Sequence, residues 1–136
     1  MNKILRIPDI KEVLEAANAT APASTEIVPI RDLIGKLDNK IREPLANYLR
    51  NCPIIWVSQS EKDPLDPSKG FVMPTGIATD GTWVWRIYWG YFVAEYGVAV
   101  PDHFVAHARD QKFEPPVLTP DEIEQVIDQY EQQWPN

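Results

Sequence analysis

The strongest constraint on this 136-residue chain is a dense aromatic segment that follows a turn signal. Seven aromatic residues, half of those in the chain, fall in the fourteen positions 83–96, directly after Thr79-Asp80-Gly81-Thr82. Because aromatic side chains bury more area than most others, such a segment forms either the centre of a core or a docking surface. The segment contains one Arg and one Glu but no His, Cys, Ser or Asp, so it indicates no catalytic chemistry.

The length fits one domain with a single hydrophobic core. Residues 1–29 form its N-terminal part: we expect a short helix over Asp9–Asn18 with Asp9 as N-cap, then a loop rich in Pro and Ala. That loop would let the first helix lie apart from the body. Residues 30–136 are expected to form the globular α+β part of the domain.

Two amphipathic stretches follow the loop. Apolar residues recur at helical spacing from Ile30 to Ile41 and again from Leu45 to Leu49, with Pro44 between them. Since proline is accepted in the first turn of a helix and disfavoured inside it, we expect two helices, or one that is kinked near Arg42-Glu43.

The period then changes to that of strands. The segment 53–59 is short, β-branched and bounded by Pro and polar residues, which predicts a buried strand. Segments 71–79 and 82–85 flank Asp80-Gly81, a strong hairpin signal. We therefore predict an α+β fold in which a small antiparallel sheet of about three strands, with its hairpin at Asp80-Gly81, packs against several helices.

Three further helices complete the prediction. Residues 85–97 are apolar on nearly all sides, which indicates a buried helix ending at Gly97, and Gly90 within it suggests close approach of another backbone. Residues 102–110 form a short helix with Phe104 and Ala108 inward. Finally, Thr119-Pro120-Asp121-Glu122 is a capping box that starts a C-terminal helix.

Charge is distributed unevenly along the chain. The net charge is −7, and residues 110–136 hold seven Asp or Glu against one Lys. Such a surface repels phosphate backbones and attracts basic partners, so we expect a basic protein partner and no direct binding of nucleic acid.

No run approaches the roughly 18 apolar residues of a membrane span. With a single cysteine and no signal-peptide pattern, we expect a cytoplasmic protein that does not bind membranes, as a monomer or a homodimer.

Candidate reactive residues are few. His103 and His107 stand four apart on a predicted helix, a spacing that lets two imidazoles share a metal, but the general-base Glu of the zinc protease pattern is replaced by Phe104. They are weak metal candidates, and a solvated or capping role is the expectation. Cys52 precedes a predicted buried strand and is expected to be a structural thiol. We expect no cofactor and no enzymatic activity.

The acidic residues are the candidate contacts for a partner. Asp63 and Asp66 lie in a loop of Asp-Pro turns, while the C-terminal helix carries acids on its outer face. The predicted contact residues are Asp63, Asp66, Asp121, Glu124, Asp128 and Glu131.

The run Thr79-Asp-Gly-Thr-Trp-Val-Trp85, the aromatic segment ending in Glu95-Tyr96-Gly97, and Val100-Pro-Asp-His-Phe104 resemble a pattern in small bacterial proteins. The likeness spans roughly 37–107, and departs from the pattern at Arg86, where many such sequences have a proline. This group resembles immunity proteins of polymorphic and contact-dependent-inhibition toxin systems. The resemblance implies a protein that neutralises a cognate toxin by binding it.

Two other functions stay open at this level. One is an adaptor or secretion-associated protein that docks through the aromatic segment, and the other is a metallohydrolase centred on His103 and His107. Salt dependence separates the first from electrostatic capture, because screening weakens charge attraction far more than apolar docking.

Overall fold

The computed structural model describes residues 3–135, and it confirms the predicted α+β class. Its helices are α1 (Lys11–Ala17), α2 (Asn39–Asn51), α3 (Tyr88–Tyr96), α4 (Asp102–Asp110) and α5 (Pro120–Gln133), with short 3-10 turns η1 (Ile30–Asp32) and η2 (Pro67–Lys69). Its strands are β1 (Leu5–Arg6), β2 (Asp9–Ile10), β3 (Ile27–Val28), β4 (Ile54–Glu61), β5 (Met73–Thr79) and β6 (Trp83–Arg86).

The main sheet has one strand more than the sequence predicted. Its order is β1-β6-β5-β4, and the pairs β4–β5 and β5–β6 are antiparallel, with the β5–β6 hairpin turning at Asp80-Gly81 as expected. However, β1 pairs with β6 in parallel, so the sheet is mixed, and β2 and β3 form a second, parallel pair. Strands of two residues carry no readable periodicity, which is why the sequence did not reveal them.

The N-terminal segment belongs to the body of the fold, and the expectation that it could lie apart is wrong. Ile7 and Ile10 are fully buried, and the indole of Trp89 donates a hydrogen bond to the Pro8 carbonyl. The first helix begins at Lys11, without a side-chain cap. Asp9, its expected cap, lies in β2 and is buried against Arg6.

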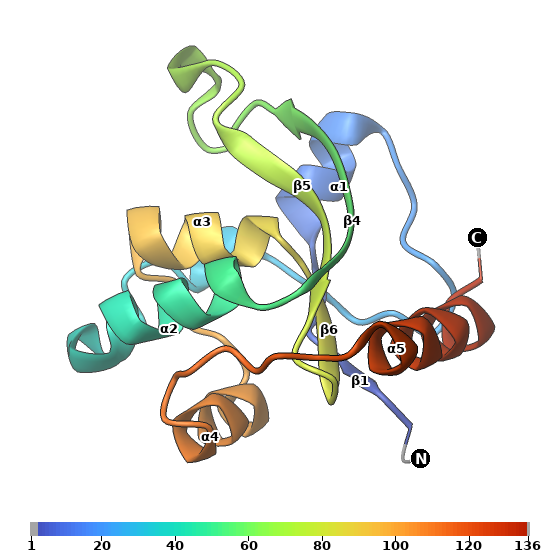
Figure 1. Cartoon of the computed structure of the whole chain (residues 1–136). Helices are drawn as coiled ribbons and strands as arrows, with labels where there is room; N and C mark the ends of the chain where they lie inside the picture. Colours follow the sequence, from blue (N-terminus) through green and yellow to red (C-terminus); the bar gives the residue numbers. More distant parts are fainter. Residues whose placement is uncertain (1–2, 136) are drawn as a thin grey trace.

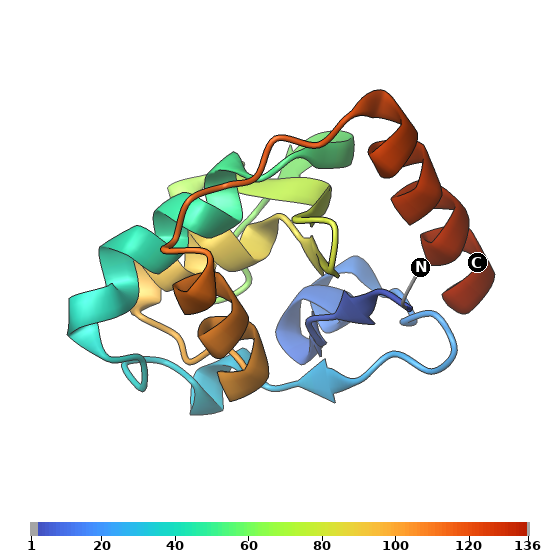
Figure 2. The ribbon, with the colours of Figure 1, turned by 60° about the horizontal axis from the view of Figure 1, so that its bottom comes forward.

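Helices cover the sheet on two sides, as Figures 1 and 2 show. On one side α2, α3 and α4 enclose the larger core, which includes most of the aromatic segment. On the other side α5 encloses a smaller cluster. It consists of Ile4 just before β1, Ile77 of β5, Val84 of β6, Val126 of α5 and Trp134 just after α5. The two cores share the sheet between them.

The aromatic segment is the centre of the larger core and offers no docking surface of its own. Helix α3 starts at Tyr88, later than expected, because Trp83–Arg86 extends as β6, and it ends at Gly97 in the left-handed conformation as predicted. A Cβ on Gly90 would lie 2.7 Å from Cγ of Arg50 and 3.4 Å from Cβ of Leu49. This confirms that another helix, α2, approaches closely at Gly90.

Two further expectations need correction. Residues 30–37 form one 3-10 turn and bends, and α2 then starts at Asn39, capped by Asp38, and continues through Pro44 as one helix. Pro44 has no N–H to donate to the carbonyl of Lys40, an exposed residue in the first turn of α2. Strand β4, expected to be buried, is an exposed edge strand.

Candidate functional site

Four of the five acids of α5 are exposed along one side of the helix, and we call them the acidic stripe (Asp121, Glu124, Asp128 and Glu131). At 3.6 residues per turn their side chains fall within an arc of about 80° on one side of the helix. Helix α5 contains no Lys or Arg. The structure therefore places these four predicted residues together, on one side of one helix.

Local sequence fixes where this helix starts. The Thr119 hydroxyl accepts a hydrogen bond from the backbone N–H of Glu122 at 3.2 Å, and the Glu122 carboxylate accepts one from the N–H of Thr119 at 2.9 Å. Pro120 occupies the first helical position. These contacts confirm the predicted capping box, which satisfies two N–H groups that would otherwise lack partners.

The opposite side of α5 is anchored to β1 by a cation that the sequence reasoning missed. The guanidinium of Arg6 lies 5.4 Å from the ring centre of Tyr130 and 5.3 Å from that of Trp134, and it donates to the Tyr130 hydroxyl at 3.2 Å. Asp9 accepts from the same guanidinium at 3.0 Å. Burial lowers the pKa of Arg6, but Asp9 and Tyr130 outweigh it and the pKa is raised. Arg6 thus stays charged and holds the helix firmly.

The two predicted contacts in the Asp-Pro loop lie elsewhere. Asp63 is fully buried, where its carboxylate accepts hydrogen bonds from the hydroxyls of Tyr91, at 2.7 Å, and Tyr96. Burial raises the pKa of Asp63, but these hydroxyls and Lys69 outweigh it, so the pKa is lowered. Asp63 therefore cannot contact a partner, and Asp66 is half-buried and caps η2 through the N–H of Ser68.

The two histidines have separate environments. His103 is exposed on α4, whereas Nε2 of His107 lies 3.0 Å from the carboxylate of Asp80. The hydroxyl of Tyr48 donates to the same carboxylate at 2.7 Å, and the pKa of Tyr48 is raised by burial and by Asp80. The hairpin turn, α2 and α4 are thus joined through one buried carboxylate. Nothing in the sequence linked position 80 to position 107.

Two kinds of reactive group are relevant within residues 3–135, a metal-binding cluster and the thiol of Cys52. No three His, Cys, Asp or Glu side chains in that range converge so as to hold a metal ion. Cys52 is buried, and burial together with Asp80 raises the pKa of its thiol to about 12. A thiol with such a pKa is protonated at neutral pH and is a poor nucleophile.

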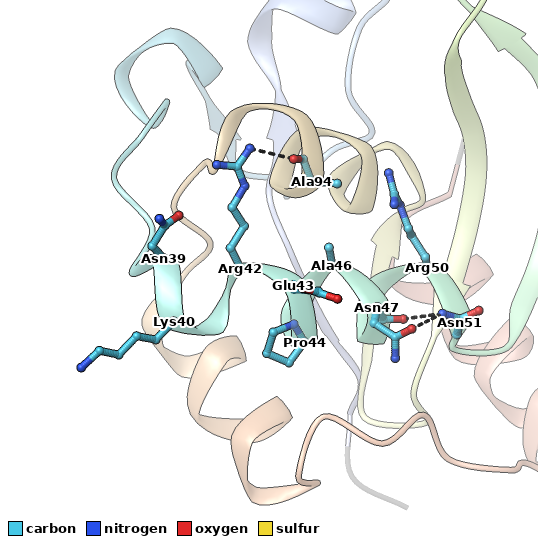
Figure 3. A pocket seen from close by; sticks show the side chains of 10 residues that line it. All are labelled: Asn39, Lys40, Arg42, Glu43, Pro44, Ala46, Asn47, Arg50, Asn51 and Ala94. Atoms are coloured by element: carbon cyan, nitrogen blue, oxygen red, sulfur yellow. Dashed lines mark hydrogen bonds between the residues drawn. The ribbon is translucent and has the colours of Figure 1, made fainter.

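A hollow lies along α2 where it passes α3 (Figure 3). Three of the four charged residues in its lining are cationic, namely Lys40, Arg42 and Arg50, and the fourth is Glu43. Arg42 donates to the carbonyl of Ala94 at 2.7 Å, so this arginine already has a partner at the end of α3. Among the described residues, none that lines the hollow is a His, Cys, Ser or Asp.

Exposed apolar side chains gather on β4, which the sequence reasoning took for a buried strand. Ile54 is 50% exposed, Trp56 43% and Val57 67%. Only Ile55 of the strand turns toward the cluster beneath α5. An edge position and a buried one share the same β-branched composition, so composition could not distinguish them.

Comparisons with models of protein families, with curated proteins and with solved structures gave no match. Within the described part of the chain, none of the helices has the length and apolar character needed to cross a bilayer.

Proposed function

We propose that this chain is a non-enzymatic binding protein that captures a basic protein partner through the acidic stripe of α5. The observation that carries the proposal is four exposed carboxylates on one side of a helix whose other side is anchored through Arg6, Tyr130 and Trp134. A rigid charged surface binds with little loss of conformational freedom, which favours affinity.

The electrostatics define the kind of partner. From Asp121 to Glu131 the stripe extends about 15 Å along the helix axis at 1.5 Å per residue. A row of negative charge of this length imitates a stretch of phosphate backbone. It therefore suits a positively charged substrate groove, such as that of a nuclease domain, and charge complementarity also accelerates the encounter.

The biological role that we propose is that of an immunity protein in a bacterial toxin system. The chain would occlude the active or substrate-binding surface of its cognate toxin, in the cytoplasm, where a free thiol such as that of Cys52 stays reduced. The resemblance of the hairpin and of the aromatic segment to such proteins supports this role, and the acidic stripe supplies its mechanism.

The experiment measures binding of the purified chain to the purified toxin domain encoded by the neighbouring gene, by calorimetry at several salt concentrations. One variant replaces the four residues of the stripe with Lys. The control variant replaces four exposed acids elsewhere with Lys and so changes the net charge equally: Glu15, Asp32, Glu43 and Glu114.

We expect the stripe variant to lose about 100-fold in affinity at low salt, since each rim charge contributes a fraction of a kcal/mol to about 1 kcal/mol. The control variant should lose much less, because its four charges lie outside the stripe and salt screens the interaction between separated exposed charges. Equal losses in the two variants would show that net charge alone acts, and wild-type affinity in the stripe variant would reject the proposal.

A further inference from the structure

The two edges of the main sheet differ sharply. The edge strand β1 has two residues, so it presents almost no free backbone. The other edge, β4, has eight residues, and its outer row of N–H and C=O groups has no partner strand within residues 3–135. Such a row is a template on which another strand can pair.

Apart from Glu61 at its end, strand β4 lacks the charged and proline residues that commonly protect an edge strand, and only two register shifts on β5 interrupt its pairing. Proteins protect long edges with Lys, Pro or inward charges, but Ile54–Ser60 contains neither a charge nor a proline. Five of the nine large apolar side chains that are exposed in the described chain lie on β4 or in the segment before β5: Ile54, Trp56, Val57, Phe71 and Val72. A free edge with these side chains is an interface that lacks its partner in the isolated chain.

We propose that β4 pairs antiparallel with β4 of a second copy of this chain, so that the two four-stranded sheets join into one continuous sheet. Pairing about a two-fold axis sets each residue of β4 against residues of the same strand, and a charged strand would then oppose like charges. Because Ile54–Ser60 is uncharged, the two copies avoid that repulsion even though each chain carries a net charge of −7.

The charges at the two ends of β4 are complementary. Glu61 closes the strand, and Arg50 lies in the last turn of α2, just before the strand begins. Both side chains are exposed, and neither forms an ion pair within residues 3–135. Antiparallel pairing brings the Glu61 end of one copy to the Arg50 end of the other, which is an attraction repeated twice by symmetry.

The register of β4 on β5 locates the axis. Pairing is uninterrupted from Trp56 to Ser58 and slips on either side of that stretch. The axis therefore passes near Val57, whose largely exposed side chain becomes buried against the second copy. Further strands cannot add at this edge once the pair has formed, so the assembly closes as a dimer.

The test is sedimentation equilibrium of the purified full chain from about 1 to about 200 µM, the range in which interfaces of modest size associate. The wild type should be a dimer at high concentration, with no larger species. Val57→Lys places like charges near the axis and should weaken dimerisation by about tenfold or more. Leu5→Lys, the same change of an exposed apolar residue on the β1 edge, should leave it unchanged.

A second measurement needs no variant. In the wild type, amide hydrogen exchange within Ile54–Glu61 should slow as protein concentration rises, while exchange in α5 stays constant. A wild type that stays monomeric over the whole range, a dimer that Val57→Lys does not weaken, an open series of larger species, or exchange in β4 that is independent of concentration would each overturn the proposal.

Discussion

The buried carboxylate of Asp80 joins the hairpin turn to α2 and α4, and its removal should be severely destabilising. One oxygen accepts the backbone N–H groups of Thr82 at 3.0 Å and Trp83 at 2.8 Å, within the hairpin turn. The other accepts a hydrogen bond from the Tyr48 hydroxyl at 2.7 Å and lies 3.0 Å from Nε2 of His107. In Asp80→Ala three donors lose their acceptor, and His107 loses the neighbouring carboxylate.

The magnitude follows from which donors water can reach. The Tyr48 side chain is fully buried and Trp83 is nearly so, whereas His107 is partly exposed and can bond to water. A buried polar group without a partner costs about 1–3 kcal/mol. Two such groups, with a smaller loss at His107, give a decrease of about 4 kcal/mol in the free energy of unfolding. That is a large part of the 5–15 kcal/mol typical of a domain.

Urea unfolding followed by tryptophan fluorescence measures this loss. Asp80→Asn keeps one acceptor for the turn and should lose about 1–2 kcal/mol, while Asp102→Ala, an exposed acid on α4, should change stability by less than about 0.5 kcal/mol. In a double-mutant cycle, Asp80→Ala and Tyr48→Phe should be non-additive, since both remove the same hydrogen bond. A loss below about 1 kcal/mol for Asp80→Ala would refute the reasoning, because it would mean that water replaces the carboxylate.

Three other perturbations test the remaining supports. The lowered pKa of Asp63 implies a contribution to stability that is present above its unfolded pKa of about 3.9 and is lost as pH falls through its folded pKa. Asp63→Asn should therefore destabilise the protein at pH 7. It should also reduce the fall of the urea midpoint as the pH is lowered. Gly76→Ala should lower the free energy of unfolding in urea by about 3 kcal/mol, because φ is +140° and the new Cβ would lie 2.4 Å from the Trp56 carbonyl oxygen. The control Gly35→Ala, where φ is +69° and no atom lies within 4 Å of the new Cβ, should lower it by about 1 kcal/mol. Trp134→Ala removes one of the two rings that contact Arg6, that of Tyr130 being the other, and should cost about 3 kcal/mol. Amide exchange should then accelerate more in α5 than in α2, and equal acceleration in both helices would contradict local anchoring.

Some residues of the candidate site are placed by contacts with their sequence neighbours, and others by contacts with residues distant in the chain. The same holds for the elements of the fold. The acidic stripe could be predicted because its helix is started by contacts within four residues and its outer side follows from helical spacing. Asp63 could not be placed, because its burial depends on Tyr91 and Tyr96, about thirty positions away, folding over the loop. The Asp63-Pro64 turn predicted from the sequence is compatible with either a buried or an exposed carboxylate.

Sequence alone therefore determined the hairpin at Asp80-Gly81, the α4 helix and the start of α5, since turn and cap chemistry act over a few bonds. Tertiary structure decided that β1 joins the sheet beside β6, that β4 is an edge and not an interior strand, and that Asp80 meets His107. A short strand has no periodicity, and an apolar strand looks alike in the middle of a sheet and at its rim. Only packing against a partner distant in the chain, or the lack of one, separates these outcomes.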